Sequence, residues 1–185
     1  MCCLSLSSYG QIGIQGGGNL TSLQIAPKPG TVLPIPTLQV GCFYDVFLTD
    51  YWCLTPGLKY VGKGASYKYT IDILGYKREI SGTLHLRYLE IPLDIAYKTD
   101  SGWFVGGGLY VAFGINAGDI QFGSLEEDAN PLDYGVSLKM GKRIDDTSVT
   151  LSYSQGLGNI SQIKNTIGYN SVFGLSVGHH FIQNR

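Results

Sequence analysis

Six charged side chains are the first candidates for chemistry, because they lie in segments that are otherwise apolar or rich in small residues. They are Asp45, Lys59, Glu90, Asp94, Asp133 and Lys139. An unpaired charge in a dry protein interior is very costly, so we expect these acids and bases to form pairs. A paired set has two interpretations: a gate or ion path, or a structural network of salt bridges. We favour the structural network.

Acid–base catalysis by two of these carboxylates is a weaker alternative. Glu90 and Asp94 fall on one face of an extended segment, but their Cα atoms are then roughly 13 Å apart, too far for a hydrolytic pair. The adjacent His179 and His180 point to opposite faces of a strand and cannot easily share a metal ion. The sequence therefore predicts no catalytic pair, no cofactor and no metal centre.

A second group of polar residues raises the alternative of a lipid-modifying enzyme with a site at the outer rim of a barrel. His85 precedes a long apolar segment, and candidate partners lie upstream of it at Ser66, Asp72 and Ser81. Such residues can activate a nucleophile when they lie within hydrogen-bond reach of one another. No motif fixes their roles, so we expect a protein without catalytic activity and keep this enzyme as the alternative.

The composition narrows the class of protein that carries these residues. The chain has 185 residues, which predicts one domain, and 26 of them are glycine and 13 are tyrosine. Charged residues make up only 15%, against roughly 25% in ordinary soluble domains. The aromatic content of 12% excludes a disordered chain, and the net charge of −1 offers nothing to nucleic-acid phosphates. No apolar run reaches the roughly 18 residues of a transmembrane helix.

Strands with a period of two residues explain the hydrophobic pattern, and no segment keeps the spacing of an amphipathic helix. Eight strands are predicted. They cover residues 11–24, 37–48, 51–62, 84–98, 102–116, 132–143, 147–156 and 170–182. Most are longer than the roughly five or six residues usual in soluble proteins. Since about 9–11 residues of tilted strand cross a bilayer, these strands are long enough to do so.

The connections between the predicted strands alternate in length. Short turns are expected near Asp50, at Asp100-Ser101 and at residues 144–146. The long connections are residues 25–36, 63–83, 117–131 and 157–169. Tight turns on one side and long loops on the other are typical of an outer-membrane barrel. Both ends of an even-stranded barrel lie on one side, so we expect Gln11 and Arg185 in the periplasm and the long connections outside the cell.

The two faces of each strand favour a membrane barrel over a soluble one. In residues 102–116, Leu109, Val111 and Phe113 share one face, whereas Gly106 and Gly108 share the other. The second face has too much glycine and too little charge for a water-exposed surface, but it suits a narrow lumen. The predicted fold is an all-β, eight-stranded antiparallel up-and-down transmembrane β-barrel. A soluble lipocalin-like barrel that binds an apolar ligand is the alternative.

Aromatic and cysteine residues refine this prediction. Amphipathic rings favour the headgroup level, so two girdles are expected. The girdle on the short-turn side would comprise Tyr51, Trp52, Tyr97, Trp103 and Tyr153, and the other would include Tyr60 and Tyr134. Cys42 and Cys53 flank the first short turn several residues out of register, so we expect both thiols to be free.

The first ten residues differ from the rest of the chain. Residues 1–10 are small and apolar and end in Ser-Ser-Tyr-Gly, which resembles the back half of a secretory signal peptide; a short flexible tail is the alternative. The predicted domain division is therefore residues 1–10 as a signal-peptide remnant or tail and residues 11–185 as the barrel domain.

Three motifs give the chain a family resemblance. Residues 88–93 read YLEIPL, residues 102–108 read GWFVGGG after a short turn, and residues 13–20 read GIQGGGNL. In these segments the chain, from Gln11 to its C-terminus, resembles the PorT-like small outer-membrane barrels of Bacteroidota, which have OmpA-like eight-stranded folds. The resemblance implies an outer-membrane barrel from a family that is mostly uncharacterised, with one namesake tied to protein secretion.

We therefore expect a bacterial outer-membrane protein with a structural or surface-recognition role and a lumen plugged by side chains. Its surroundings would be outer-membrane lipid, with a possible protein partner outside the cell and no nucleic-acid partner. The longest connection, residues 63–83, mixes charged and aromatic residues and suits such contact. Its candidate recognition residues are Lys68, Tyr69, Asp72, Tyr76 and Arg78.

A gel experiment tests the predicted class of fold. Protein refolded in detergent should migrate differently in boiled and unboiled samples, because a closed ring of strand hydrogen bonds leaves no edge from which a barrel unravels. Identical mobility in the two samples would contradict a membrane barrel. A monomer that stays in solution without detergent would favour the lipocalin-like alternative.

Overall fold

The computed structural model describes residues 10–26, 30–73, 76–115, 130–161 and 167–181, and all of its regular elements there are strands. They are β1 (Gly10–Ala26), β2 (Thr31–Leu33), β3 (Ile35–Phe47), β4 (Trp52–Ile73), β5 (Tyr76–Lys98), β6 (Trp103–Gly114), β7 (Leu132–Ile144), β8 (Thr147–Gly156) and β9 (Ile167–His180). Within these ranges we find no helix of the length and hydrophobicity needed to span a membrane. Residues 1–9, which include most of the predicted signal-peptide remnant, lie outside the described ranges.

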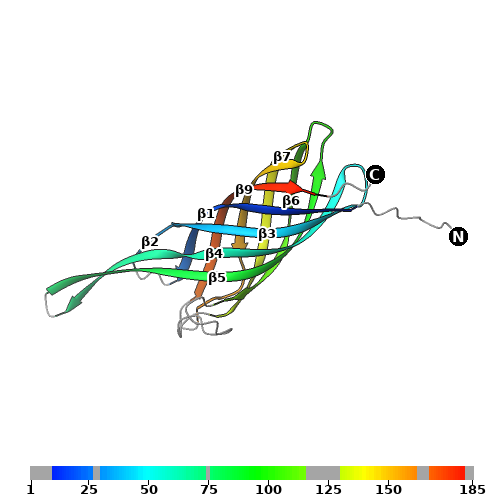
Figure 1. The fold of residues 1–185 in the computed structure, drawn as a ribbon. Coiled ribbons are helices and arrows are strands. Elements are labelled where there is room, and N and C mark those ends of the chain that lie inside the picture. Colours follow the sequence, from blue (N-terminus) through cyan, green and yellow to red (C-terminus); the bar gives the residue numbers. More distant parts are fainter. Residues whose placement is uncertain (1–9, 27–29, 74–75, 116–129, 162–166, 182–185) are drawn as a thin grey trace.

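The strands form one closed antiparallel ring (Figure 1). Neighbours in sequence pair from β3 to β9, and the ring closes because β1 pairs with both β3 and β9. Only Pro34 separates β2 from β3, and both pair with β4, so together they act as one long strand. The nine elements thus make an eight-stranded barrel wall, which confirms the predicted fold.

The barrel has two different ends. We call the end with the short connections the turn end; these are residues 48–51, 99–102 and 145–146. Gly102 (φ 82°) and Asp145 (φ 53°) take up the left-handed conformations that such tight turns need. The first strand begins at this end, since Gly10 pairs with Val46, and the last strand finishes there. We call the opposite end the loop end.

The segment predicted as the longest loop, residues 63–83, is mostly strand, so that prediction was wrong. Strands β4 and β5 pair without interruption from Lys63 opposite Leu86 to Ile73 opposite Tyr76. Alternating aromatic and β-branched residues favour strands, and the Tyr67 and Tyr69 rings stack with centroids 6.0 Å apart. Only residues 74–75, between the strands, fall outside the description.

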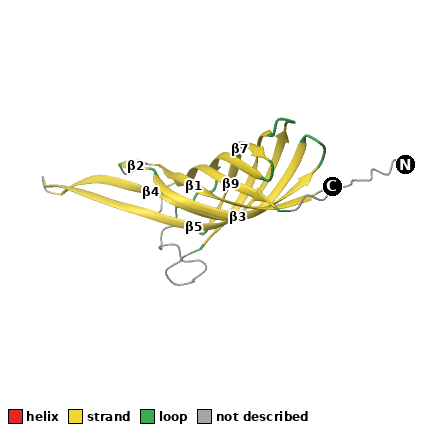
Figure 2. Ribbon diagram, turned by 45° about the horizontal axis from the view of Figure 1, so that its top comes forward, coloured by secondary structure: helices red, strands yellow, loops and turns green. Residues whose placement is uncertain are grey.

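The β4–β5 hairpin therefore extends past the barrel wall (Figures 1 and 2). Strand β3 pairs with β4 only as far as Val61, and β6 pairs with β5 only as far as Tyr88. Beyond these points β4 and β5 form a ribbon that is joined on one side by the three residues of β2. We call residues 62–73 and 76–87 the ribbon.

The apolar face of each strand points outward, as predicted. Among the outward side chains, Leu38 is 75% exposed and Leu109 and Leu138 are each 65% exposed, whereas Asp133 and Tyr88 on the inner face are 0% exposed. This distribution is the inverse of a soluble barrel and is stable only when lipid covers the outside. It therefore argues against the lipocalin-like alternative.

Part of the predicted aromatic girdle forms at the turn end. Tyr97 stacks on Tyr51 and meets Trp52 edge to face, with centroids 5.9 and 5.4 Å apart, and Trp103 is exposed at the same end. Tyr153 was wrongly assigned to this girdle. Strand β8 starts at the turn end, so Tyr153 lies toward the loop end, where its hydroxyl bonds Gln155.

Glycines make room for aromatic rings inside the barrel. Phe43, Phe104 and Tyr110 each lie directly opposite a glycine of the neighbouring strand; these glycines are Gly13, Gly141 and Gly135. A Cβ on Gly141 would come within 2.5 Å of the Phe104 ring, and one on Gly135 within 2.8 Å of the Tyr110 ring. A narrow eight-stranded lumen can hold a ring only where the opposite side chain is missing.

Cys42 and Cys53, the cysteines within the described ranges, are both free, as predicted from their register. Cys42 lies opposite Leu58, and Cys53 lies opposite Phe47. Cys42 is exposed on the outer face, whereas Cys53 is fully buried inside. The two thiols therefore sit on opposite sides of the barrel wall as well as at different heights.

Introducing the same charged side chain on the two faces tests this assignment. Leu93 is half exposed and lies midway along the part of β5 that pairs with β6, and Leu93→Arg should destabilise the folded barrel in lipid by about 2–4 kcal/mol because the guanidinium enters hydrocarbon. Ser152→Arg projects into the lumen instead and should cost less. Urea unfolding in lipid vesicles, followed by the unboiled gel band, measures both. A smaller effect for Leu93→Arg than for Ser152→Arg would reverse the assignment.

Candidate functional site

A buried ionic cluster lies in the lumen toward the loop end. Lys63 is at its centre: its Nζ is 3.0 Å from Asp133 Oδ2 and 3.1 Å from Glu90 Oε2. Lys59 lies four positions earlier on the same face of β4, and its Nζ is 2.9 Å from Glu90 Oε1. The Lys63, Glu90 and Asp133 side chains are at most 3% exposed. We call these four residues the loop-side cluster; its two ammonium groups balance its two carboxylates.

Aromatic and amide groups complete the surroundings of Lys63. Its Nζ lies 4.3 Å from the centroid of the Tyr110 ring and 5.1 Å from that of Tyr88, both in the range of cation–π contacts. Asn170 Nδ2 donates to Asp133 Oδ2 at 2.8 Å, and the Tyr110 hydroxyl donates to the same oxygen at 3.4 Å. The buried charges are therefore solvated by protein groups rather than by bulk water.

Lys63 is the functional residue that the sequence reasoning missed. It was assigned to a loop, whereas β4 continues through it and places it on the same inner face as Lys59. The available signal was the alternation of side chains between the two faces of a strand. Residues 59, 61 and 63 must share a face if the strand does not end at residue 62. Its carboxylate partner Asp133 is 70 residues away, and no local pattern reveals that pairing.

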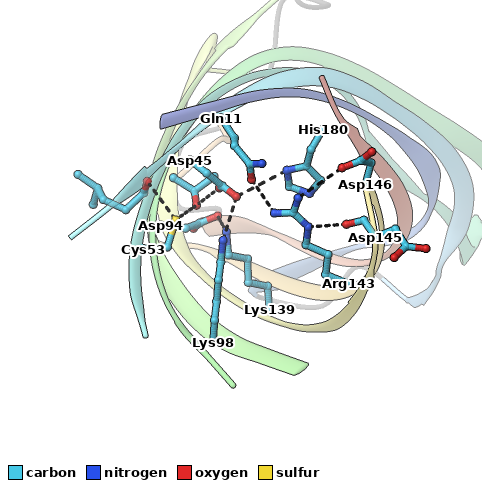
Figure 3. Close-up of polar contacts among 12 residues, drawn as sticks. Gln11, Asp45, Cys53, Asp94, Lys98, Lys139, Arg143, Asp145, Asp146 and His180 are labelled. Carbon is cyan, nitrogen blue, oxygen red and sulfur yellow. Dashed lines mark hydrogen bonds and ion pairs between the residues drawn. The ribbon is translucent and has the colours of Figure 1, made fainter. Parts of the chain in front are cut away.

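A second polar cluster lies near the turn end (Figure 3). Asp45 Oδ2 is 3.0 Å from Lys98 Nζ, and Asp45 Oδ1 accepts a hydrogen bond of 2.7 Å from the Thr55 hydroxyl. His180 Nδ1 lies 3.8 Å from the same carboxylate, and its ring meets Phe43 edge to face at 5.0 Å. Lys98 was not among the predicted lumen charges, because it is the last residue of β5.

Asp94 and Arg143 are the centres of further polar contacts in this half of the lumen. Lys139 Nζ is 3.1 Å from Asp94 Oδ2, and the Ser137 hydroxyl donates to Asp94 Oδ1 at 2.6 Å. Arg143 donates to Gln11 Oε1 at 2.6 Å and to the backbone oxygen of Asp145 at 2.8 Å. Each of the six charged residues predicted for the lumen thus lies beside an opposite charge.

A polar cavity of about 270 Å³ occupies the lumen between the loop-side cluster and the turns. Its lining runs from Lys59 at one end to Asp50 and Thr99 at the other. Hydroxyl groups of β7, β8 and β9 form one wall; they belong to Ser137, Ser148, Thr150, Ser152, Ser154 and Ser176. The cavity therefore reaches the turn end, and the loop-side cluster lies at its inner limit.

A buried apolar cluster lies on the other side of the loop-side cluster. A buried hydrophobic core joins residues of β1, β4, β5, β6 and the segment after β8. Its members are Leu23, Ala65, Leu86, Tyr88, Tyr110, Ala112 and Ile160. From the loop end to the turn end, the lumen thus contains an apolar layer, an ionic layer and a polar cavity.

Among the described side chains, those considered for an enzyme form no hydrogen bonds with one another. The Ser66 hydroxyl forms a hydrogen bond of 2.6 Å with the Thr83 hydroxyl, and His85 lies opposite Gly64. Ser81 pairs with Lys68 further along the ribbon, and Asp72 belongs to the part of the ribbon whose side chains are not described. No hydrogen bond between His85 and Ser66 occurs in the described structure. Among the described residues no cluster of His, Cys, Asp and Glu is suited to a metal ion.

The predicted recognition residues all lie on the ribbon. Lys68 and Arg78 are exposed, and Tyr69 is partly buried against Tyr67. The side chains of Asp72 and Tyr76 lie outside the described part, although both residues belong to the paired strands.

A closed ring of strands with an apolar outer surface and a charged interior defines an outer-membrane β-barrel. The sequence matches the family described as outer membrane protein beta-barrel domain over residues 5–162. The chain belongs to this family, and its location is the bacterial outer membrane.

Solved structures of outer-membrane proteins are similar to this chain at low sequence identity. The crystal structure of Neisserial surface protein A is similar with a TM-score of 0.57 and 11% identity, over 92% of this chain and 97% of that one. Ail of Yersinia pestis has a TM-score of 0.49 with 9% identity, over 93% and 99% of the two chains. OprG of Pseudomonas aeruginosa has a TM-score of 0.45 with 16% identity, over 94% and 97%. Comparison with curated proteins finds no significant sequence match.

Removing the central ammonium tests the loop-side cluster. Lys63→Met should destabilise the barrel by roughly 3–5 kcal/mol, because Asp133 then stays buried without a cation, while Glu90 keeps Lys59. The double variant Lys63→Met/Asp133→Asn should recover part of the loss. Urea unfolding in lipid vesicles measures both.

Lys98→Met is the matched control at the turn end. The Lys98 side chain is 21% exposed, and Asp45 keeps its bond to Thr55, so the loss there should be smaller. If Lys63→Met costs no more than Lys98→Met, the loop-side cluster has no special part in stability.

Proposed function

We propose that this protein is a non-enzymatic outer-membrane barrel that presents the ribbon to a protein partner outside the cell. The single observation that carries the proposal is the continuous pairing of β4 with β5 beyond the last pairs of β3 and β6. A two-stranded ribbon on a rigid barrel holds its side chains in fixed positions, and function concentrates in such projecting segments. Its recognition residues would be Lys68, Tyr69, Asp72, Tyr76 and Arg78.

The contents of the lumen support a role other than transport. The apolar layer and the loop-side cluster are stacked across the loop-end half of an eight-stranded barrel, whose interior is only wide enough for side chains. We propose that together they plug the lumen and that the ion pairs are structural. On this view the polar cavity is a pocket open toward the periplasm and not a channel.

The positions of the first and last strands support an orientation of the barrel in the membrane. With the first and last strands both reaching the turn end, a periplasmic turn end places the ribbon outside the cell. The YLEIPL strand and its glycine-rich partner support a place among the PorT-like barrels of Bacteroidota. The lipid-modifying enzyme is the less favoured function, since Ser66 is bonded to Thr83 rather than to His85.

Epitope insertion and site-specific crosslinking on intact cells test the proposal. A tag inserted near Gly75 should be accessible from outside, whereas one at Asp100-Ser101 should be hidden until the outer membrane is broken. A photo-crosslinking residue at Thr70, which is exposed on the ribbon, should give a discrete protein adduct, and one at Asp100 should give none from the external medium.

A shortened ribbon provides the control. Lys68 pairs directly with Ser81, so residues 69–80 can be replaced by Asn-Gly, which favours a two-residue turn. This variant should keep the heat-dependent gel shift and lose the adduct when the crosslinker is moved to Lys68. Absence of any adduct from the full-length ribbon would contradict the proposed surface. So would a tag at Asp100-Ser101 that is accessible on intact cells while the tag near Gly75 is hidden.

A further inference from the structure

The outer face of β5 changes character abruptly where the ribbon begins. Ile95, Leu93 and Ile91 are exposed in turn, and Leu89 continues the series toward the loop end. The next two outward positions are basic: Arg87 and His85, both exposed. A cationic pair thus follows directly on an apolar stripe, on the side of the wall that meets lipid.

The height of Arg87 matches the edge of the hydrocarbon layer. Tyr97, in the turn-end girdle, and Arg87 are ten positions apart on β5. This is about 33 Å along the strand at roughly 3.3 Å per residue. At a tilt near 40° the vertical separation is about 25 Å, the height of the apolar band of such barrels. If Tyr97 marks one headgroup level, Arg87 therefore lies at the other.

Both basic side chains are exposed beside their neighbouring strands. On β4, Arg87 lies opposite Gly62 and His85 lies opposite Gly64, and on the other side the Ile115 N–H donates to the Arg87 carbonyl oxygen at 2.7 Å. In the described part of the chain, the Arg87 and His85 side chains form no hydrogen bond and no ion pair. By contrast, the lumen lysines Lys59, Lys63, Lys98 and Lys139 each lie within 3.1 Å of a carboxylate.

We propose that Arg87 and His85 bind the phosphate of a lipid in the outer leaflet. A guanidinium presents a planar fork of N–H donors that matches phosphate oxygens, and an imidazole N–H adds a further donor. The apolar stripe that adjoins Arg87 and His85 on the outer face of β5 receives the acyl chains. A soluble anion has no acyl chains to contact that stripe. The stripe therefore favours a phospholipid or a phosphorylated glycolipid as the ligand. This site is independent of the partner proposed for the ribbon.

Lipid retention by purified protein tests the site. Wild-type protein is placed in nanodiscs of phosphatidylcholine containing either the phosphorylated glycolipid lipid A or the same glycolipid without its phosphates. After release, native mass spectrometry measures the bound glycolipid. Wild type should retain the phosphorylated form preferentially, and Arg87→Gln should lower that retention roughly fivefold. Arg87→Lys should fall between the two, because a lysine keeps the charge and loses the fork.

The matched control is Arg78→Gln, the same substitution on the same strand. Arg78 is exposed on the ribbon, nine positions beyond Arg87 and above the lipid, so its loss should leave retention unchanged. The unboiled gel band verifies that every variant is folded. Equal loss from Arg78→Gln, equal retention of the glycolipid without phosphates, or no effect of Arg87→Gln would each overturn the proposal.

Discussion

Satisfaction of every backbone hydrogen bond without help from water is the constraint on which this structure depends. In hydrocarbon an open strand edge is not tolerated, so the sheet has to return on itself. Here the return is made by β1, which is paired with β3 on one side and with β9 on the other. Only where the wall rises past the lipid, in the ribbon, does one edge of β5 run without a neighbouring strand among the described residues.

Closure in lipid also determines what lies inside. Because the apolar residues are used on the outside, the interior receives the polar ones, and a narrow lumen leaves little water to solvate them. The chain meets this condition by matching charges at short range, as in Lys63 between Glu90 and Asp133. Where the lumen holds more space, near the turn end, hydroxyl groups line a cavity together with further ion pairs.

Local and periodic features could be read from the sequence, whereas distant pairings could not. The alternation of apolar and small residues predicted the strands and their faces, and the turn at Asp50 predicted that Cys42 and Cys53 are out of register. The contact of Lys63 with Asp133 depends on the stagger of strands all around the ring, which no single hairpin specifies. The ribbon was missed because its charged residues were interpreted as a loop, although the alternation continues through Tyr67 and Tyr69.

The pairing of rings with glycines has a consequence for how such an interior changes over generations. Phe104 and Gly141, or Tyr110 and Gly135, occupy one shared volume from two strands. A methyl group added at Gly141 would meet the Phe104 ring at 2.5 Å and also the Val149 carbonyl oxygen, so it requires both a smaller ring and a shift of the neighbouring backbone. These positions should therefore vary jointly among descendants of this chain. Substitutions inside the lumen are therefore coupled across strands, whereas a lipid-facing apolar residue can be exchanged for another apolar residue alone.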